Sequence, residues 1–213
     1  MQTKDTRLDV QLRPALPSES AFIAEAVLAA MGRSPRNICE NSESGCATDT
    51  NDDSDSLFGD YDIVLAAVRV IAGCEDTLYS YRNAYILTCN GVPAGCIIGY
   101  NGAFYAEMAE TTFSMAADLL GVDEFNPGTE TQSGEYYLDS LYVSPEFRGH
   151  KFGSMLIRNQ LEIAQGLGFE KVTLIVDQDK TNLQTLYASL GFELDGYVKF
   201  FGSDFLRMVQ YLA

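Results

Sequence analysis

Strand-like and helix-like patterns alternate through the second half of the sequence, and this order constrains the fold more than any other feature. The strand patterns cover residues 136–143, 171–176, 192–200 and 205–213, and the helix patterns cover 152–168 and 181–191. The two patterns can be told apart because side chains repeat every two residues in a strand and every 3.6 in a helix. A chain that alternates in this way is predicted to form an α/β sheet with mixed strand directions.

The first half of the chain adds further elements. Strands are expected over residues 7–15, 84–90 and 92–101, and helices over 18–32, 57–73 and 104–121. Asn90 and Gly91 both tolerate positive φ, which predicts a hairpin between the second and third of these strands. Ser18 or Ser20 is the expected N-cap of the first helix. For the last helix, Thr181 is the expected N-cap and Gly191 the stop.

The whole chain, residues 1–213, is predicted to form one domain with two additions. Residues 33–56 are polar and acidic, which is typical of a loop. Residues 104–134 contain a helix of their own where a short connection would be enough to join neighbouring strands. A helical insertion is therefore expected there.

The composition argues against several classes of function. A net charge of −16 disfavours general binding to nucleic acid, and no apolar run approaches the roughly 20 residues that cross a bilayer. Neither nucleic acid nor a membrane is therefore an expected partner. The N-terminal residues lack the apolar core of a signal peptide, and the five cysteines show no C-x-x-C pair. These features predict a cytoplasmic protein with reduced thiols, and a single histidine, His150, predicts no histidine-rich metal site.

The turn from the strand at 136–143 into the helix at 152–168 has an unusual composition, PEFRGHKFGS (145–154). A helix N-terminus offers unpaired N–H groups and the positive end of the helix dipole, and glycines let the backbone approach an anion closely. The turn is either a phosphate cradle or only a tight connection. Its spacing matches neither the P-loop nor the dinucleotide-binding pattern.

Two linked motifs resemble the GNAT superfamily of acyl-CoA-dependent N-acetyltransferases. LYVSPEFRGHKFGSMLI (141–157) is similar to the cofactor segment of that family, and TNLQTLYASLGF (181–192) to its Asn…Tyr…Gly-Phe element. The resemblance implies a GNAT-type fold: a mixed, mostly antiparallel central sheet with a splayed central strand and helices on both faces. It also implies acetyl-CoA as co-substrate, an amine acceptor and no metal.

The resemblance assigns residues to the cofactor. The main chain of Leu141 and Val143 would pair with the pantetheine arm as an added strand would. The apolar positions of 136–143 do not keep one parity, and a bulge between Leu138 and Leu141 would reconcile them. Asn182 matches a cofactor contact, unless it only caps its helix. The backbone N–H groups that would take the pyrophosphate belong to Arg148, Gly149, His150, Lys151, Phe152, Gly153 and Ser154.

The chain departs from the family at Lys151, where members usually carry glycine. Lysine adds a positive charge, but it restricts φ where glycine would not. The conformation of the turn and its affinity for the cofactor depend on how the chain accommodates this residue.

Tyr187 stands at the position of the family's general acid. A phenol with a pKa near ~10 can return a proton to a leaving thiolate, although a packing tyrosine would also fit there. Asp139 is the first candidate for the base that takes the proton of the amine, with Glu135 or a chain of waters as alternatives. His150 lies in the phosphate turn and is expected to face solvent.

The expected function is transfer of an acetyl group from acetyl-CoA to a primary amine of a small molecule or peptide, by direct attack. The alternative is a non-catalytic regulatory module that binds acyl-CoA on the same fold. The insertion at 104–134 would be a lid over the acceptor side or a dimer contact, in a monomer or a homodimer. Its acidic residues that could attract a cation are Glu107, Glu110, Asp118, Asp123 and Glu124.

Overall fold

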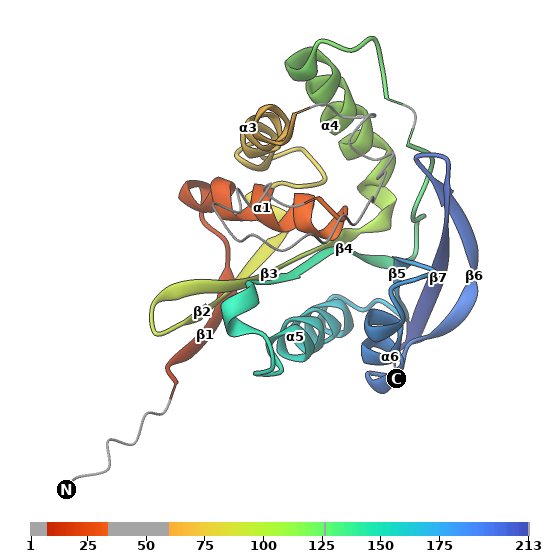
Figure 1. The fold of residues 1–213 in the computed structure, drawn as a ribbon. Coiled ribbons are helices and arrows are strands. Elements are labelled where there is room, and N and C mark those ends of the chain that lie inside the picture. Colours follow the sequence, from red (N-terminus) through yellow and green to blue (C-terminus); the bar gives the residue numbers. More distant parts are fainter. Residues whose placement is uncertain (1–7, 34–59, 126, 213) are drawn as a thin grey trace, which may run out of the picture.

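A single sheet organises the protein, as the computed structural model in Figure 1 shows; it describes residues 8–33, 60–125 and 127–212. The strand order is β1-β2-β3-β4-β5-β7-β6. Neighbouring strands run antiparallel except β4 and β5, which run parallel. This mixed, mostly antiparallel sheet confirms the predicted fold class. The strands are β1 (Val10–Pro14), β2 (Ala84–Cys89), β3 (Val92–Asn101), β4 (Tyr136–Val143), β5 (Lys171–Asp177), β6 (Glu193–Phe200) and β7 (Ser203–Tyr211).

Helices cover both faces of the sheet. In Figure 1, α1, α3 and α4 lie on one face, and α5 and α6 lie on the other. The helices are α1 (Ser20–Ala30), α3 (Tyr61–Ala72), α4 (Tyr105–Leu120), α5 (Phe152–Gly166) and α6 (Thr181–Ser189). Short 3₁₀ turns are η1 (Pro17–Glu19), η2 (Tyr81–Asn83), η3 (Gly102–Phe104) and η4 (Pro145–Phe147). Each face has its own apolar core. Within the described ranges, no helix combines the length and apolar character that a membrane crossing requires.

The ends of the helices match the sequence only in part. The hairpin at Asn90 (φ 52°) and Gly91 (φ 79°) and the stop at Gly191 (φ 98°) are confirmed. The expected serine and threonine N-caps are wrong, because α1 is preceded by the η1 turn and α6 already begins at Thr181. The acidic loop expected at 33–56 lies, apart from its first residue, outside the described residues.

The bulge predicted in the strand at 136–143 is present. Ile97 of β3 pairs with Leu141 of β4, but Gly99, two residues on, pairs with Leu138, three residues back. The extra residue turns Leu138 and Leu141 toward the same core, on the α5 face. It leaves Asp139 at the irregular point of the strand, and bulges of this kind often re-aim a side chain beside an active site.

Strand β4 separates from β5 almost as soon as the two have paired. Their ladder consists of Tyr136 with Val172 and Tyr137 with Thr173, whereas β5 continues to pair with β7 as far as Asp177. Beyond Tyr137, therefore, the edge of β4 that faces β5 has no strand partner in the described chain. The predicted splay of the central strand is observed.

Candidate active site

The turn between β4 and α5 has the backbone geometry of an anion site. Gly149 has φ +83° and Lys151, the N-cap of α5, has φ +62°. The Met155 N–H is the first to bond back into the turn, to the Lys151 carbonyl at 3.1 Å. The N–H groups of the residues between them, 152–154, precede that bond and are therefore the free donors of the helix N-terminus.

The basic side chains of the turn are exposed, and two of them are held by main-chain oxygens. The Arg148 Nε donates to the Val143 carbonyl at 3.2 Å, and the His150 Nδ1 lies 3.1 Å from the carbonyl oxygens of Phe147 and Arg148. Phe152 is buried in the core of the α5 face, so only its backbone is available to a ligand.

Gly153 is not required by the conformation or by the internal packing of the turn. Its φ lies outside the left-handed region, and an added Cβ would meet Leu186 Cδ2 at 3.7 Å and Val143 Cγ2 at 4.0 Å, both ordinary contacts. No conformation or internal contact therefore requires glycine at this position, whereas a ligand that approaches the backbone closely would. The same contacts show that the end of β4, the start of α5 and helix α6 converge here.

The two residues carried over from the second motif lie on α6. Tyr187 is 8% exposed and packs its ring against Phe192, with centroids 5.9 Å apart. Burial raises the pKa of Tyr187 to about 12, which keeps its hydroxyl protonated at physiological pH. Asn182 is exposed in the first turn of α6.

Asp139 faces the other side of the sheet. One carboxylate oxygen accepts a hydrogen bond from the Tyr100 hydroxyl and the other from the Ser140 hydroxyl, both at 2.8 Å. Burial raises its pKa, while these hydrogen bonds act in the opposite direction. No described contact joins Asp139 to Tyr187, and the two lie on opposite faces of the sheet where β4 and β5 diverge.

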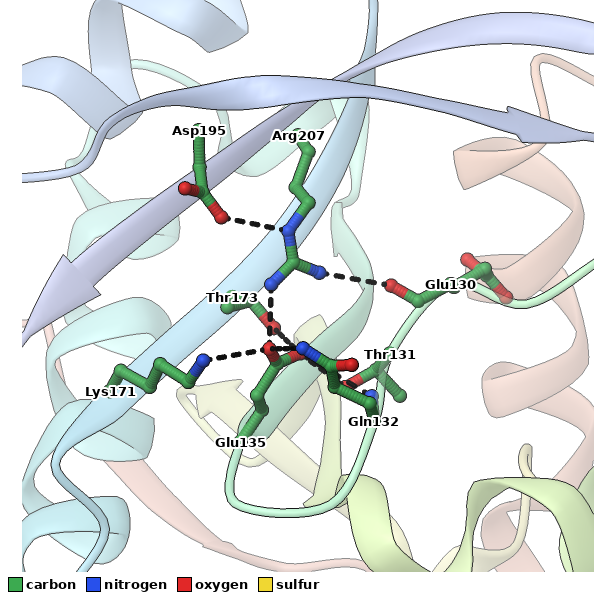
Figure 2. Close-up of polar contacts among 8 residues, drawn as sticks. All are labelled: Glu130, Thr131, Gln132, Glu135, Lys171, Thr173, Asp195 and Arg207. Carbon is green, nitrogen blue, oxygen red and sulfur yellow. Dashed lines mark hydrogen bonds and ion pairs between the residues drawn. The ribbon is translucent and has the colours of Figure 1, made fainter.

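Glu135, the alternative base, is committed to a structural ion-pair cluster (Figure 2). Its fully buried carboxylate accepts from Arg207 at 2.7 Å and from Lys171 at 3.0 Å, and Thr131, Gln132 and Thr173 also donate to it. Burial alone would raise the pKa of Glu135, but the hydrogen bonds from these cations lower it to about 2. A carboxylate with so low a proton affinity is a poor acceptor for the proton of an amine.

Glu130 is a buried acid that no sequence motif predicts. It is 7% exposed and accepts a hydrogen bond from the Tyr137 hydroxyl. Burial raises its pKa well above the ordinary value, and the nearby charge of Asp139 raises it further. No pattern in VDEFNPGTETQSG distinguishes Glu130 from its exposed neighbour Glu124, so the sequence held no signal for it.

Helix α4 does not cover Tyr187. It lies on the face of the sheet opposite α6 (Figure 1), so it is not placed over the α6 side, and its role as a lid over the acceptor side or as a dimer contact stays a prediction. The five acidic residues expected to draw a cation to the lid are all exposed. Four of them, Glu110, Asp118, Asp123 and Glu124, line a groove of about 680 Å³ between α4 and the loop after it. What reaches the site from this segment is Glu130, in the loop that leads into β4.

The motifs and the fold agree with known protein families. The sequence matches the model of the Acetyltransferase (GNAT) family over residues 73–192, which is more than half of the chain. The chain therefore belongs to the GNAT family. Among the described residues, no cluster of three or more His, Cys, Asp or Glu side chains is arranged to hold a metal ion.

Curated relatives carry a more specific name. The chain is 29% identical over 126 residues to thialysine N-ε-acetyltransferase of Bos taurus and 28% identical over 126 residues to that of Sus scrofa. Each match covers 59% of this chain and 62% of the relative, so the chain spans less than two thirds of the relatives that it matches.

Solved structures support the fold along nearly the whole chain. A crystal structure titled as an acetyltransferase superposes with a TM-score of 0.70 at 22% identity, over 95% of this chain and 100% of that one. An N-acetyltransferase from Staphylococcus aureus Mu50 gives 0.72 at 19% identity, over 93% and 99%. At such identities the likeness establishes the fold alone.

Proposed function

We propose that this protein transfers an acetyl group from acetyl-CoA to a primary amine of a small molecule or peptide. One observation carries the proposal: the free edge of β4 leads directly into the glycine turn at the start of α5. A backbone edge is suited to a pantetheine arm, and the helix N-terminus at its end is suited to a pyrophosphate. The names of the curated relatives, which are N-acetyltransferases, agree with this assignment.

The residues of the turn and of β4 would hold the cofactor. The main chain of Leu141 and Val143 would pair with the pantetheine arm. The N–H groups of residues 149–154 would bind the pyrophosphate, whereas the predicted donor of Arg148 is already bonded to the Pro145 carbonyl at 3.3 Å. Gly153 leaves room for that group, and exposed Arg148 and Lys151 add positive charge. Acetyl-CoA, when bound, supplies the acetyl group as a thioester.

Two side chains would move the protons. Asp139 accepts a proton from the ammonium form of the acceptor, which frees the nitrogen lone pair to form the new C–N bond. As the C–S bond breaks, Tyr187 donates its hydroxyl proton to the leaving sulfur, and the excess proton that remains on the acetylated nitrogen returns to the Tyr187 oxygen, which leaves a neutral amide, thiol and phenol. The raised pKa of Tyr187 keeps the hydroxyl proton in place until the thiolate forms.

A thiol-release assay over a panel of primary amines tests the proposal. Asp139→Asn should lower kcat/KM by about a hundredfold or more, which is the usual reach of general base catalysis, and leave acetyl-CoA binding unchanged. Asp62→Asn, at an exposed aspartate on α3, is the matched control. Binding of acetyl-CoA without release of thiol from any amine would support the regulatory module instead.

A further inference from the structure

The buried carboxyl group of Glu130 and the partly buried carboxyl group of Asp139 lie in one cluster of tyrosines on the face that carries α1, α3 and α4. Tyr137 donates to Glu130 and Tyr100 donates to Asp139, and the two tyrosine rings are in contact with centroids 5.7 Å apart. Tyr137 is fully buried and Tyr100 is 4% exposed. The two acids are therefore linked through a dry contact in which each charge would be felt by the other.

Among the described residues, neither carboxyl group forms an ion pair. Arg207 comes near, but its guanidinium bonds the main-chain oxygen of Glu130 at 3.4 Å and pairs with Glu135 and Asp195 (Figure 2). Lys171 is likewise bound to Glu135. Two negative charges without a cation are costly in such surroundings, so one carboxyl group is expected to keep its proton.

The hydrogen bonds indicate which group keeps it. Asp139 accepts two hydrogen bonds, from Tyr100 and Ser140, which favour its ionised form, and Glu130 accepts one, from Tyr137. Two further titratable groups lie around the pair, Tyr79 and Tyr105. Burial raises the pKa of both, as it does for Tyr100 and Tyr137, so all four tyrosines remain neutral.

We infer that Glu130 and Asp139 form a coupled pair that holds one proton at neutral pH, with the proton on Glu130 and the charge on Asp139. By keeping its proton, Glu130 leaves the negative charge on Asp139 at the bulge of β4, where an ammonium group would give up a proton; Glu130 itself takes no part in that transfer. The role of Asp139 as base rests on the proposed function, whereas the protonation of the pair does not.

Infrared spectroscopy of the full chain without ligand tests the pair directly. At about pH 7 ordinary carboxyl groups are ionised, so the C=O stretch of a protonated carboxyl group stands out. We expect this band in the wild-type protein and in Asp139→Asn, and its loss in Glu130→Gln. Glu124→Gln, an exposed acid of the same loop, is the control and should keep it. Absence of the band in the wild type, or its loss in Asp139→Asn alone, would overturn the inference.

A second variant covers the case in which Glu130→Gln does not fold. Tyr137→Phe removes the hydroxyl that is bonded to Glu130 and should shift the frequency of the band, and an unchanged frequency would contradict the assignment. In kinetics, Glu130→Gln replaces a neutral acid by a neutral amide, so kcat/KM should change by about threefold or less. The plot of kcat/KM against pH should still fall on its acidic side. A loss as large as that of Asp139→Asn would show that Glu130 itself is ionised. A Glu130 band in a protein that acetylates no amine would leave the pair intact and reject the proposed function.

Discussion

The two faces of the sheet contribute to the site in different ways. On the α5 and α6 face, the side that we propose for the cofactor is made mostly of main chain: the free edge of β4, two glycines and the N-terminus of α5. On the opposite face, the side that we propose for the acceptor is made of side chains, with two carboxyl groups among buried tyrosines. A main-chain site fixes residue types at fixed spacing and leaves a motif in the sequence, whereas a side-chain site assembled from distant segments leaves none.

The acceptor face contains a second contrast. Glu130 and Glu135 are both buried and lie five residues apart, yet their environments are opposite. Glu135 meets Arg207 and Lys171 and its pKa is lowered to about 2, whereas Glu130 meets a tyrosine and another acid and its pKa is raised. Burial alone therefore does not decide what a glutamate does; the charge of its neighbours does.

The largest effect is expected on the cofactor face. Gly153→Glu places a carboxylate at the N-terminus of α5, where the pyrophosphate would bind, and should weaken acetyl-CoA binding by at least about a hundredfold, or roughly 2.7 kcal/mol. Calorimetry measures the affinity. Gly166→Glu adds the same charge to the other end of the same helix, where an added Cβ meets nothing within 4 Å, and should bind normally. Equal affinities in two folded variants would remove the phosphate role of the turn.

Tyr187→Phe removes the hydroxyl and keeps the ring, so it tests the role of the hydroxyl alone. The ring packs on Phe192 and should stay in place, so stability and acetyl-CoA affinity are expected to change little. Turnover should fall roughly ten- to a thousandfold because the proton for the leaving sulfur is lost. Steady-state kinetics gives kcat, with Tyr197→Phe on the exposed surface of β6 as the control. A fully active Tyr187→Phe would reduce Tyr187 to a packing residue.

Much of the cofactor face could be predicted from the sequence. The strand at 136–143, its bulge and the start of α5 follow from parity, glycines and the family motif. The predicted N-caps were wrong by one or two residues. For α1 the reason is a 3₁₀ turn that precedes the helix and shifts the start of the helix. The arrangement of side chains on the proposed acceptor face could not be predicted from the sequence. The place of Glu130 beside Tyr137 depends on the path of the loop before β4, and Arg207 of β7, 77 residues away in the chain, bonds to the main chain of that loop.

The two buried glutamates should respond to pH with opposite sign. Because the folded pKa of Glu135 lies below its ordinary value of ~4.3, its contribution to stability is complete above about pH 5 and is lost as the pH falls toward about 2. Glu130 has a raised folded pKa, so it destabilises the fold as the pH rises above its unfolded value. Glu135→Gln should lower the free energy of unfolding by about 3 kcal/mol, because Lys171 and Arg207 lose their partner. Glu130→Gln should lower it much less. Urea unfolding over a range of pH measures both, and a Glu130→Gln variant that loses as much as Glu135→Gln would contradict the contrast.

The smallest effect concerns Lys151, where the chain departs from its family. A lysine at φ +62° costs about 1 kcal/mol relative to a conformation that its Cβ prefers. Lys151→Gly removes this strain and should stabilise the fold by up to about 1 kcal/mol, less what glycine adds to the entropy of the unfolded chain. Lys151→Ala keeps the strain and removes the same charge. If the charge assists the pyrophosphate, both variants should bind acetyl-CoA a few-fold more weakly, because an exposed charge contributes little, and only the glycine variant should gain stability in urea. Unchanged affinity in both would mean that the lysine serves neither the turn nor the cofactor, and that the main-chain donors alone carry the binding on this face.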